Sequence, residues 1–444
     1  MADSAMNTAV SALQAQSAAL SVISQNLSNS STTGYKSVVS SFLDLVIQQG
    51  TNNSIASGGV RAITTQNVDS QGVIASASSS TDMAIDGKGF FAVSYGLDGT
   101  DTEYTRDGEF STDSSGYLVL SGTNYYLKGW ATDATGDVVS SNTSSVSSLT
   151  TIDLGAYARS NGTPTTSYTL DANLPAEAQS DTSSYTAGFS TTMTVYDSLG
   201  TAQYVDATFV PNSDNTWTMT VGNPTNSTGT TTTGTLTTTT TGDAYSYTVS
   251  FNSDGTFSTV TAVTDSDGFS PPLTSDGYPE IDIGGWTDGA SSSSVALDLS
   301  KTTQVDSGET SPLLTVSSTS QNGVGSGTLS SISISTSGLV TAKYSNGQSV
   351  PIYKIPVVTF ANDDGLKPVS DNVYEQTYAC GDPILSTAGS NGTGTIEGGN
   401  LENSNVDTST QFSNMIVCQQ AYSAAAQVIS SDKQMFSSLI DVVR

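Results

Sequence analysis

The sequence predicts a mainly β protein with an α-helix at each end, and three observations lead to this fold class. Apolar residues recur at steps of three and four at both termini, which is the period of an α-helix. Between the termini, apolar and hydroxyl residues alternate and turn dipeptides recur, which is typical of antiparallel β-structure. No Lys or Arg lies between Arg159 and Lys301, which marks a separate block. We therefore expect a nested multidomain protein with two antiparallel domains resembling sandwiches or barrels.

The N-terminal helix is predicted from an apolar stripe that neither Gly nor Pro interrupts before Gly34. Asp3 or Ser4 can cap its start, and Gly34 permits a positive φ at its end. Asn26 and Asn29 lie in its polar last turns. The stripe consists of Met6, Val10, Leu13, Ser17, Leu20, Ser24 and Leu27.

The C-terminal helix is predicted from the same spacing, which continues without Gly or Pro to the end of the chain. The two helices would be roughly 35 and 50 Å long. Stripes of this length favour a partner helix, so we expect the two to pair as a coiled coil; the alternative is that each packs on its own domain. The second stripe consists of Met415, Gln419, Tyr422, Ala426, Ile429, Lys433, Phe436, Ile440 and Val443.

Two segments illustrate the β pattern of the middle region. Tyr245, Tyr247, Val249 and Phe251 alternate with hydroxyl residues, which predicts a half-buried strand. The Asn346-Gly347 dipeptide lies between two apolar alternating segments and predicts a hairpin. The predicted organisation is a terminal helical domain (1–36 and 400–444), a connector (37–70), a first β domain (71–150 and 300–399) and an inserted outer β domain (151–299).

Composition excludes most kinds of active site. The chain has 444 residues, with 12 Lys and Arg, 41 Asp and Glu, no His and two Cys, and its formal net charge is −29. Cys/His zinc centres and histidine-based catalysis are therefore excluded. We expect no enzyme, no cofactor and no metal; a carboxylate-dependent glycosidase is the enzyme alternative. The few cations do not supply the basic face that nucleic acid requires.

Two further absences concern membranes and export. No run of about 18 apolar residues exists, so we expect no membrane insertion. No compact apolar stretch precedes Lys36, the first basic residue, so we also expect no cleaved signal peptide.

Several motifs occur in a fixed order along the chain. Residues 23–36 combine an Asn-rich helix end with Thr-Gly-Tyr-Lys, and residues 401–407 read Leu-Glu-Asn-Ser-Asn-Val-Asp. In this order, the motifs resemble those of the bacterial flagellar hook protein family, and more broadly of the flagellar axial rod and hook proteins. The β motifs that carry the resemblance include Gly87, Gly89, Phe90, Phe91, Tyr104, Arg106, Gly108, Phe110, Tyr196, Asp197 and Gly200.

The resemblance implies a structural subunit of the flagellar hook. Such a subunit self-assembles into a flexible, curved, hollow tube, a universal joint that transmits torque from the rod to the filament during swimming. Its implied partners are copies of itself, the distal rod, the hook cap, the hook–filament junction proteins and the type III export apparatus. Its implied location is extracellular, in the hook and basal body. The terminal stripes, with Asn26, Asn29 and Gly34, would then serve assembly.

Two other readings are compatible with parts of the sequence. A distal rod subunit of the same family would share the helices and the β motifs, but it would not need an insertion as long as residues 151–299. A Ser/Thr-rich surface adhesin would explain the acidity and leave both terminal stripes unexplained.

The net charge leads to a first prediction. Copies that each carry −29 repel one another, and this repulsion is screened over roughly 8 to 10 Å at ordinary salt. Assembly of the purified chain should therefore increase with added salt, as followed by light scattering. A scattering signal that falls as salt rises would contradict the prediction.

Overall fold

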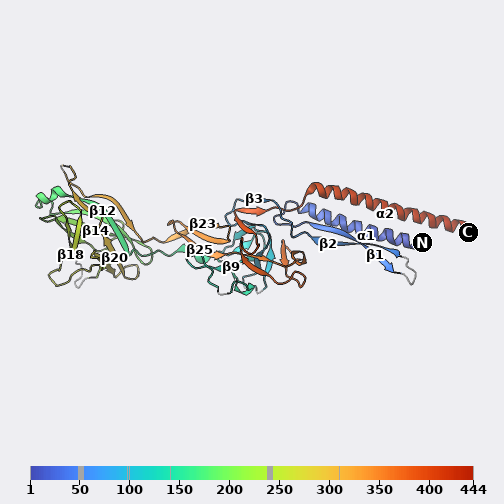
Figure 1. Cartoon of the computed structure of the whole chain (residues 1–444), viewed down its shortest axis with the longest axis horizontal. Coiled ribbons are helices and arrows are strands. Elements are labelled where there is room, and N and C mark those ends of the chain that lie inside the picture. The colour runs from blue at the N-terminus through green and yellow to red at the C-terminus, as the bar shows by residue number, and fades with distance from the viewer. Residues whose placement is uncertain are drawn as a thin grey trace. The chain divides into compact units, whose positions relative to one another are not determined.

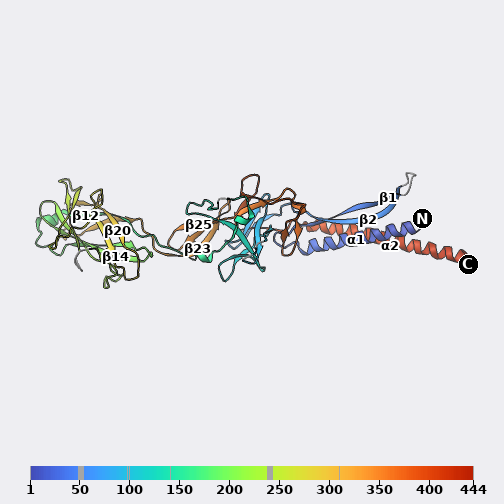
Figure 2. The same ribbon diagram turned by 90° about the horizontal axis from the view of Figure 1, so that it is seen from below.

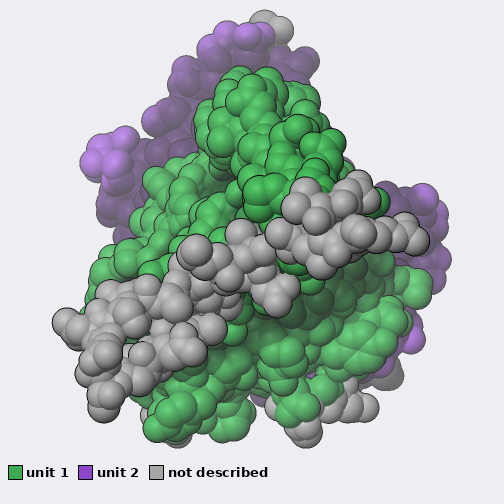
Figure 3. Space-filling model, turned by 90° about the vertical axis from the view of Figure 1, so that its right-hand side faces the viewer, with its two compact units in different colours: residues 1–158, 330–343, 349–444 green, residues 159–329, 344–348 purple. Residues whose placement is uncertain are grey.

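The computed structural model describes residues 2–48, 55–97, 99, 101–140, 142–237, 244–309 and 311–443. They belong to two compact units (Figures 1 and 3). The predicted fold class is confirmed, because strands dominate and one α-helix lies at each terminus. No helix among the described residues combines the length and apolarity needed to cross a membrane. Unit 1 comprises Met1–Ala158, Ser330–Lys343 and Ser349–Arg444, and unit 2 comprises Arg159–Leu329 and Tyr344–Gln348.

The helices of unit 1 are α1 (Ala2–Ser28) and α2 (Thr408–Val443). They lie side by side with both chain termini at the same end, so they are antiparallel (Figures 1 and 2). Asp407 caps α2, because its Oδ1 accepts a hydrogen bond from the Ser409 amide at 2.9 Å.

An antiparallel hairpin of β1 (Val38–Gln48) and β2 (Ile55–Gln66) packs beside α1. The sequence predicts a connector here, but its many β-branched residues form strands instead. The Val60 amide donates to Ser11 Oγ of α1 at 3.2 Å. Gly59 allows this approach, because a Cβ there would clash with Ser11.

The β part of unit 1 is an antiparallel sheet in the order β24-β25-β9-β5-β6-β28-β27, in which β8 and β10 also pair with β9, and β7 pairs with β8. Three short pairs join it: β3 with β31, β4 with β30, and β26 with β29. The predicted Asn346-Gly347 hairpin is confirmed as β24 and β25. The bounds are β3 (Ile74–Ser76), β4 (Met83–Asp86), β5 (Phe91–Tyr95), β6 (Glu103–Thr105), β7 (Phe110–Thr112), β8 (Leu118–Leu120), β9 (Tyr125–Ala131), β10 (Thr150–Thr151), β24 (Leu339–Tyr344), β25 (Ser349–Lys354), β26 (Pro356–Thr359), β27 (Lys367–Pro368), β28 (Val373–Glu375), β29 (Ile384–Thr387), β30 (Thr395–Gly398), β31 (Asn400–Glu402), and the 3-10 helices η1 (Val146–Ser148), η2 (Gly155–Tyr157) and η4 (Asp363–Gly365).

Aromatic side chains fill the core of this β part. The Phe90 ring meets Phe360 and Tyr374 edge to face, with centroids 6.0 and 5.9 Å apart. Tyr104 meets Phe360 at 4.8 Å. Such edge-to-face pairs add to the stabilisation that burial of the rings gives.

Unit 2 contains two sheets whose inner faces share one apolar core. One is the meander β13-β14-β15-β17-β18; the other has the order β16-β19-β20-β12-β21, with β22 also beside β12. Most pairs are antiparallel as predicted, but β12 pairs in parallel with β20 and β21. The bounds are β11 (Arg159–Ser160), β12 (Ser167–Pro175), β13 (Phe189–Tyr196), β14 (Ala202–Pro211), β15 (Thr216–Val221), β16 (Thr235–Leu236), β17 (Tyr245–Phe251), β18 (Phe257–Ala262), β19 (Glu280–Gly284), β20 (Ser293–Asp298), β21 (Thr303–Val305), β22 (Thr315–Gln321), β23 (Gly327–Ile334), which starts in unit 2, and η3 (Ala176–Ser180).

The alternating segment 245–251 forms β17, and its apolar residues enter the core as predicted. Unit 2 extends past the expected boundary at residue 299, because β21 and β22 both pair with β12. A closing strand that returns to the start of a domain is a long-range pairing, and local patterns do not reveal it.

Two buried tryptophans of unit 2 lead to a prediction about its stability. Trp217 Nε1 donates to Gln304 Oε1 at 2.9 Å, whereas Trp286 Nε1 has no hydrogen-bond partner among the described residues. Trp217→Phe leaves a buried acceptor unpaired and should lower the free energy of unfolding by about 1–3 kcal/mol more than Trp286→Phe. Urea unfolding of unit 2, followed by pulse proteolysis, measures both. Equal losses would contradict the assigned role of the Trp217 hydrogen bond.

Candidate assembly site

The end of α1 is closed by side chains that the sequence marks as a helix stop. Asn26 is buried, and its amide group bonds both backbone groups of Val38, with its Oδ1 accepting at 2.8 Å and its Nδ2 donating at 2.7 Å. Tyr35 Oη also donates to Asn26 Oδ1 at 3.1 Å. Asn26 therefore fixes the direction in which the chain leaves the helix.

Gly34 lies where the N-terminal segment meets the β part of unit 1. Its φ is +67°, and a Cβ there would lie 2.8 Å from the Asp107 backbone, so only glycine fits. Its amide donates to the Glu402 carbonyl at 2.8 Å. Burial in this contact raises the pKa of Asp107 to about 6.

A buried ion cluster follows directly. The Lys36 Nζ lies 2.6 Å from Glu402 Oε1, and Arg106 Nη1 lies 3.3 Å from Glu402 Oε2. The three side chains are at most 4% exposed. We call Lys36, Arg106 and Glu402 the junction cluster. The junction cluster joins three distant parts of the chain. Lys36 lies in the segment between α1 and β1, Arg106 directly follows β6, and Glu402 is the last residue of β31.

Backbone groups complete the junction cluster. Glu402 Oε1 also accepts from the Gly72 amide at 2.7 Å, and Lys36 donates to the Ser70 carbonyl at 2.7 Å. Arg106 donates to the carbonyls of Ile85 at 3.3 Å and Gly87 at 2.7 Å. Its guanidinium carbon lies 5.6 Å from the centre of the Phe90 ring, within range of a cation–π contact.

The negative charge of Glu402 keeps Lys36 and Arg106 charged although both are buried. Burial lowers the pKa of both Lys36 and Arg106, and Glu402 opposes this in each case. Two buried cations therefore depend on one carboxylate, and loss of that carboxylate would leave both uncompensated.

The terminal segments are further joined by Asn405. Its Oδ1 accepts from the Ser37 amide at 2.7 Å, and its Nδ2 donates to the carbonyls of Ser70 at 3.0 Å and Asn67 at 3.3 Å. Strand β31 also pairs with β3. Residues just before α2 thus hold those just after α1.

The structure buries a different face of α1 from the predicted stripe. The buried side chains are mainly small, whereas Met6 and Val10 are exposed and Leu13, Leu20 and Leu27 are half-buried. Small residues allow α2 and the hairpin to approach α1 closely, which leaves the longer side chains outside. The buried set is Ala9, Ala15, Ala19, Val22, Ile23 and Asn26.

Helix α2 likewise leaves much of its apolar surface uncovered. Of the predicted stripe, Met415 and Ile429 are half-buried, while Gln419, Tyr422 and Phe436 are exposed. The side chains of Ile440 and Val443 lie outside the described residues. Between α1, β1 and α2 lies a cavity of about 270 Å³, lined in part by Val22, Phe42 and Cys418. A role in contacts between copies stays a prediction for the stripe residues.

The predicted β-motif residues lie in two places. Phe90, Phe91, Tyr104 and Phe110 are buried in unit 1, and Arg106 joins the junction cluster. There Gly87 and Gly89 have positive φ, and a Cβ on Gly108 would clash with Met83. Tyr196, Asp197 and Gly200 lie at the turn between β13 and β14 in unit 2. Asp197 is fully buried and accepts from Gln203 Nε2 at 2.7 Å.

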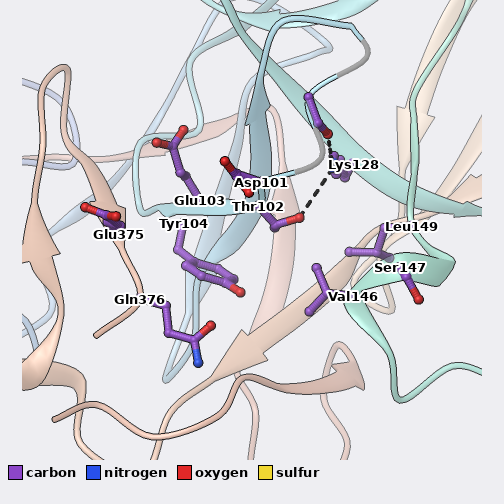
Figure 4. Close-up of a pocket in the computed structure, with 11 residues that line it drawn as sticks. Asp101, Thr102, Glu103, Tyr104, Lys128, Val146, Ser147, Leu149, Glu375 and Gln376 are labelled. Atoms are coloured by element: carbon purple, nitrogen blue, oxygen red, sulfur yellow. Dashed lines mark hydrogen bonds between the residues drawn. The ribbon is translucent and has the colours of Figure 1, made fainter. Parts of the chain in front are cut away.

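Another cavity of unit 1, of about 680 Å³, has a mixed lining (Figure 4). Lys128 Nζ donates to the Gly99 carbonyl at 3.1 Å and to Thr102 Oγ1 at 3.3 Å. Burial raises the pKa of Glu103, as does the charge of Glu375. The described residues that line this cavity include no paired nucleophile and base. Across the described residues, no group of three or more acidic or thiol side chains is placed to hold a metal.

Comparison with known proteins matches nearly the whole chain to flagellar axial proteins. The families are "Flagella basal body rod protein" at residues 6–36, "Flagellar hook protein FlgE/F/G D1 domain" at 84–182, "Flagellar basal body protein FlaE D2 domain" at 160–324 and "Flagellar basal body rod FlgEFG protein C-terminal" at 397–442. The flagellar hook protein FlgE of Rhizobium meliloti (strain 1021) is 31% identical over 449 residues, covering 99% of this chain and 98% of that protein. The chain belongs to the flagellar hook protein family.

Other hook proteins show similar coverage. Those of Treponema pallidum (strain Nichols) and Salmonella typhimurium (strain LT2) are each 30% identical, over 468 and 441 residues, with 98% of both chains covered. The family resemblance predicted from the motifs is therefore confirmed. A hook protein is a structural subunit of the flagellum and not an enzyme, and its place is the flagellar hook and basal body.

Sequence reasoning did not assign Lys36 and Glu402 of this hook protein a role in the site. Both stand in quoted motifs, but 366 residues separate them in the chain, so no local pattern joins them. A signal that could have found Lys36 is the scarcity of cations, because it is one of only 12 Lys and Arg residues and follows a helix stop. Asn26, Gly34 and Arg106, by contrast, were all among the predicted residues.

The junction cluster leads to a prediction with an internal control. Glu402→Gln keeps the shape but leaves two buried cations uncompensated, and should lower the free energy of unfolding of unit 1 by about 3–5 kcal/mol. Glu375→Gln breaks the exposed Lys367–Glu375 pair, at 64% and 52% exposure, and should cost about 0–1 kcal/mol. Guanidinium titrations of both full-length variants measure the difference. Similar midpoints would show that the buried cluster does not stabilise the junction.

Proposed function

We propose that this chain self-assembles through its terminal helices into the flexible hollow tube of the hook and transmits torque as a universal joint. One observation carries the proposal: the paired helices leave many large apolar side chains exposed. So many large apolar side chains exposed on one pair of helices are typical of interaction sites. The exposed side chains are Met6, Val10, Phe412, Ile416, Val417, Tyr422, Val428, Met435 and Phe436.

The exposed side chains lie on several sides of the helix pair, because α1 and α2 bury only one face of each helix in the other and in the hairpin. A surface of this kind meets different patches on neighbouring copies. Such head-to-tail contacts generate open helical assemblies when the rotation from one copy to the next does not close a ring. This geometry supports a tube wall built from many copies.

The proposal assigns a role to each domain. The terminal helices (1–36 and 400–444) form the inner layer of the tube, the first β domain surrounds it, and the inserted domain faces outward. The junction cluster supports the transmission of torque, because it ties the helical segments rigidly to the β part of unit 1. Bending then comes from sliding between β domains of neighbouring copies, while the helical layer keeps the tube closed.

The proposal also covers partners and export. Copies of this chain would continue from the distal rod, grow beneath the hook cap and end at the hook–filament junction proteins. The chain would leave the cell unfolded through the type III export apparatus and function outside the cell. The motif resemblance and the family matches support these partners as a group.

The proposed function is tested by charging the exposed helical surface. Phe436 is 39% exposed on α2, and Phe436→Asp should abolish tube formation because a carboxylate cannot enter an apolar subunit contact. Negative-stain microscopy and pelleting of the full-length chain measure this, and near-ultraviolet circular dichroism should show unchanged β cores. The control is Leu313→Asp, at a 69% exposed site in unit 2, which should form normal tubes. Normal tubes from Phe436→Asp would overturn the proposed role of the helices.

A further inference from the structure

Carboxyl groups without a cation lie where the N-terminal segment meets the β part of unit 1. Asp107 lies against Gly34, and its Oδ1 accepts from the Glu109 amide at 3.1 Å. Asp82, which is 6% exposed, and Glu109 both act on Asp107 through their charges. None of the ion pairs among the described residues includes these three carboxyl groups. The negative charge of Asp107 is therefore partly buried without compensation.

This setting favours the protonated form of Asp107. Burial is the main reason that its pKa is raised to about 6, and the charges of Glu109 and Asp82 act in the same direction. Burial raises the pKa of Asp82 as well. The two cations of the junction cluster lie close by in the sequence, but both are bound to Glu402. A proton on Asp107 therefore removes a charge that nothing else in the contact offsets.

A second contact of the same kind lies directly after β2. Val68 is 2% exposed, and its amide donates to Asp364 Oδ1 at 3.4 Å. The carboxyl group of the next residue, Asp69, lies beside that of Asp363 in η4. Asp363 Oδ1 is buried and has no hydrogen-bond partner in the described part of the chain. Burial raises the pKa of Asp363, and the adjoining Asp69 raises it further.

The cations near this second contact compensate it weakly. Lys88 Nζ lies 3.9 Å from Asp69 Oδ1, but the two side chains are 70% and 56% exposed, so water screens the pair. Arg106 also interacts with Asp363 through its charge, but its guanidinium is engaged in the junction cluster. Both contacts thus bring carboxyl groups out of water without a dedicated cation.

We propose that attachment of the N-terminal segment to the β part of unit 1 takes up protons at Asp107 and Asp363, so that a mildly acidic medium tightens the junction. Detachment returns both carboxyl groups to water, where an Asp has its usual pKa of about 3.9. A carboxyl group that holds its proton more tightly in the attached state favours attachment as the pH falls. For Asp107, whose pKa is about 6 when attached, this gain begins near pH 6 and is complete below about pH 4.

The proton-binding contacts complement the junction cluster. The cluster depends on the negative charge of Glu402, whereas the contacts at Asp107 and Asp363 are strengthened when a negative charge is lost. All of these groups lie within one chain, so the inference does not depend on tube formation and goes beyond the proposed function. Because the proposed path of torque runs through this junction, its firmness would change with the pH around the hook.

Hydrogen exchange of the dilute, unassembled full-length chain tests the proton uptake. Mass spectrometry at pH 7, 6 and 5 gives protection factors, corrected for the intrinsic exchange rate at each pH, for peptides covering residues 29–36 and 67–72. The Gly34 amide, bound to the Glu402 carbonyl, reports on the first contact, and the Val68 amide on the second. Protection of the first peptide should rise about tenfold between pH 7 and pH 5, and that of the second should also rise.

Two neutral variants assign the protons to their sites. Asp107→Asn keeps the Oδ1 acceptor, should raise protection of residues 29–36 at pH 7 about tenfold or more, and should abolish its rise in acid. Asp363→Asn should abolish the rise at residues 67–72 alone. Asp382→Asn, at an exposed position of unit 1, is the matched control and should keep both rises.

Three results would overturn the proposal. The first is protection that stays level or falls between pH 7 and pH 5 in the unaltered chain. The second is a rise that persists in both Asp107→Asn and Asp363→Asn. The third is lower protection or unfolding of Asp107→Asn at pH 7, because removal of an uncompensated charge should strengthen the contact. None of these results bears on tube formation, which the Phe436→Asp experiment tests separately.

Discussion

The arrangement of unit 1 depends on one buried carboxylate. Glu402 compensates Lys36 and Arg106 at the same time, and each of these three side chains comes from a different part of the chain. A buried charge is stable only with its partners in place, so the cluster stabilises the one arrangement of the three segments in which all three side chains meet. The remaining contacts of the junction follow from it: Gly34 donates to the Glu402 carbonyl, Gly72 to its carboxylate, and Asn405 fixes the segments beside it. The termini of the chain are thereby attached to the β part of unit 1.

Because of this attachment, the helical segments stay fixed to the β part of unit 1 even though the helices expose much apolar surface. Their inner faces use alanine and other small residues, so the area buried within one chain is modest. The longer side chains, such as Val10, Tyr422 and Phe436, remain outside. Isolated helices with so little internal packing are marginal in water. The junction cluster fixes where the helical segments meet the β part of unit 1.

Local patterns predicted local structure well. The alternation at Tyr245–Phe251 became β17, the Asn346-Gly347 turn became the β24–β25 hairpin, and the N-terminal helix ended at Ser28, directly before the polar stretch that leads to Gly34. What failed depends on neighbours far away in the chain. Residues 37–70 were expected to be a connector, but their strands pair with each other and pack on α1. The face of α1 that is buried within one chain is not the leucine stripe, because close packing against α2 and the hairpin falls on smaller residues; a role of the stripe in contacts between copies stays a prediction.

The chain has few cations, and their positions determine where opposite charges can meet. Outside the junction cluster, Lys and Arg make only exposed ion pairs among the described residues, and unit 2 has none between Arg159 and Lys301. Copies of such a chain attract one another weakly through charge and repel strongly, so the cohesion of a tube has to come from apolar burial in the helical layer. Because that burial is not directional, single charge pairs are needed to fix which patches meet.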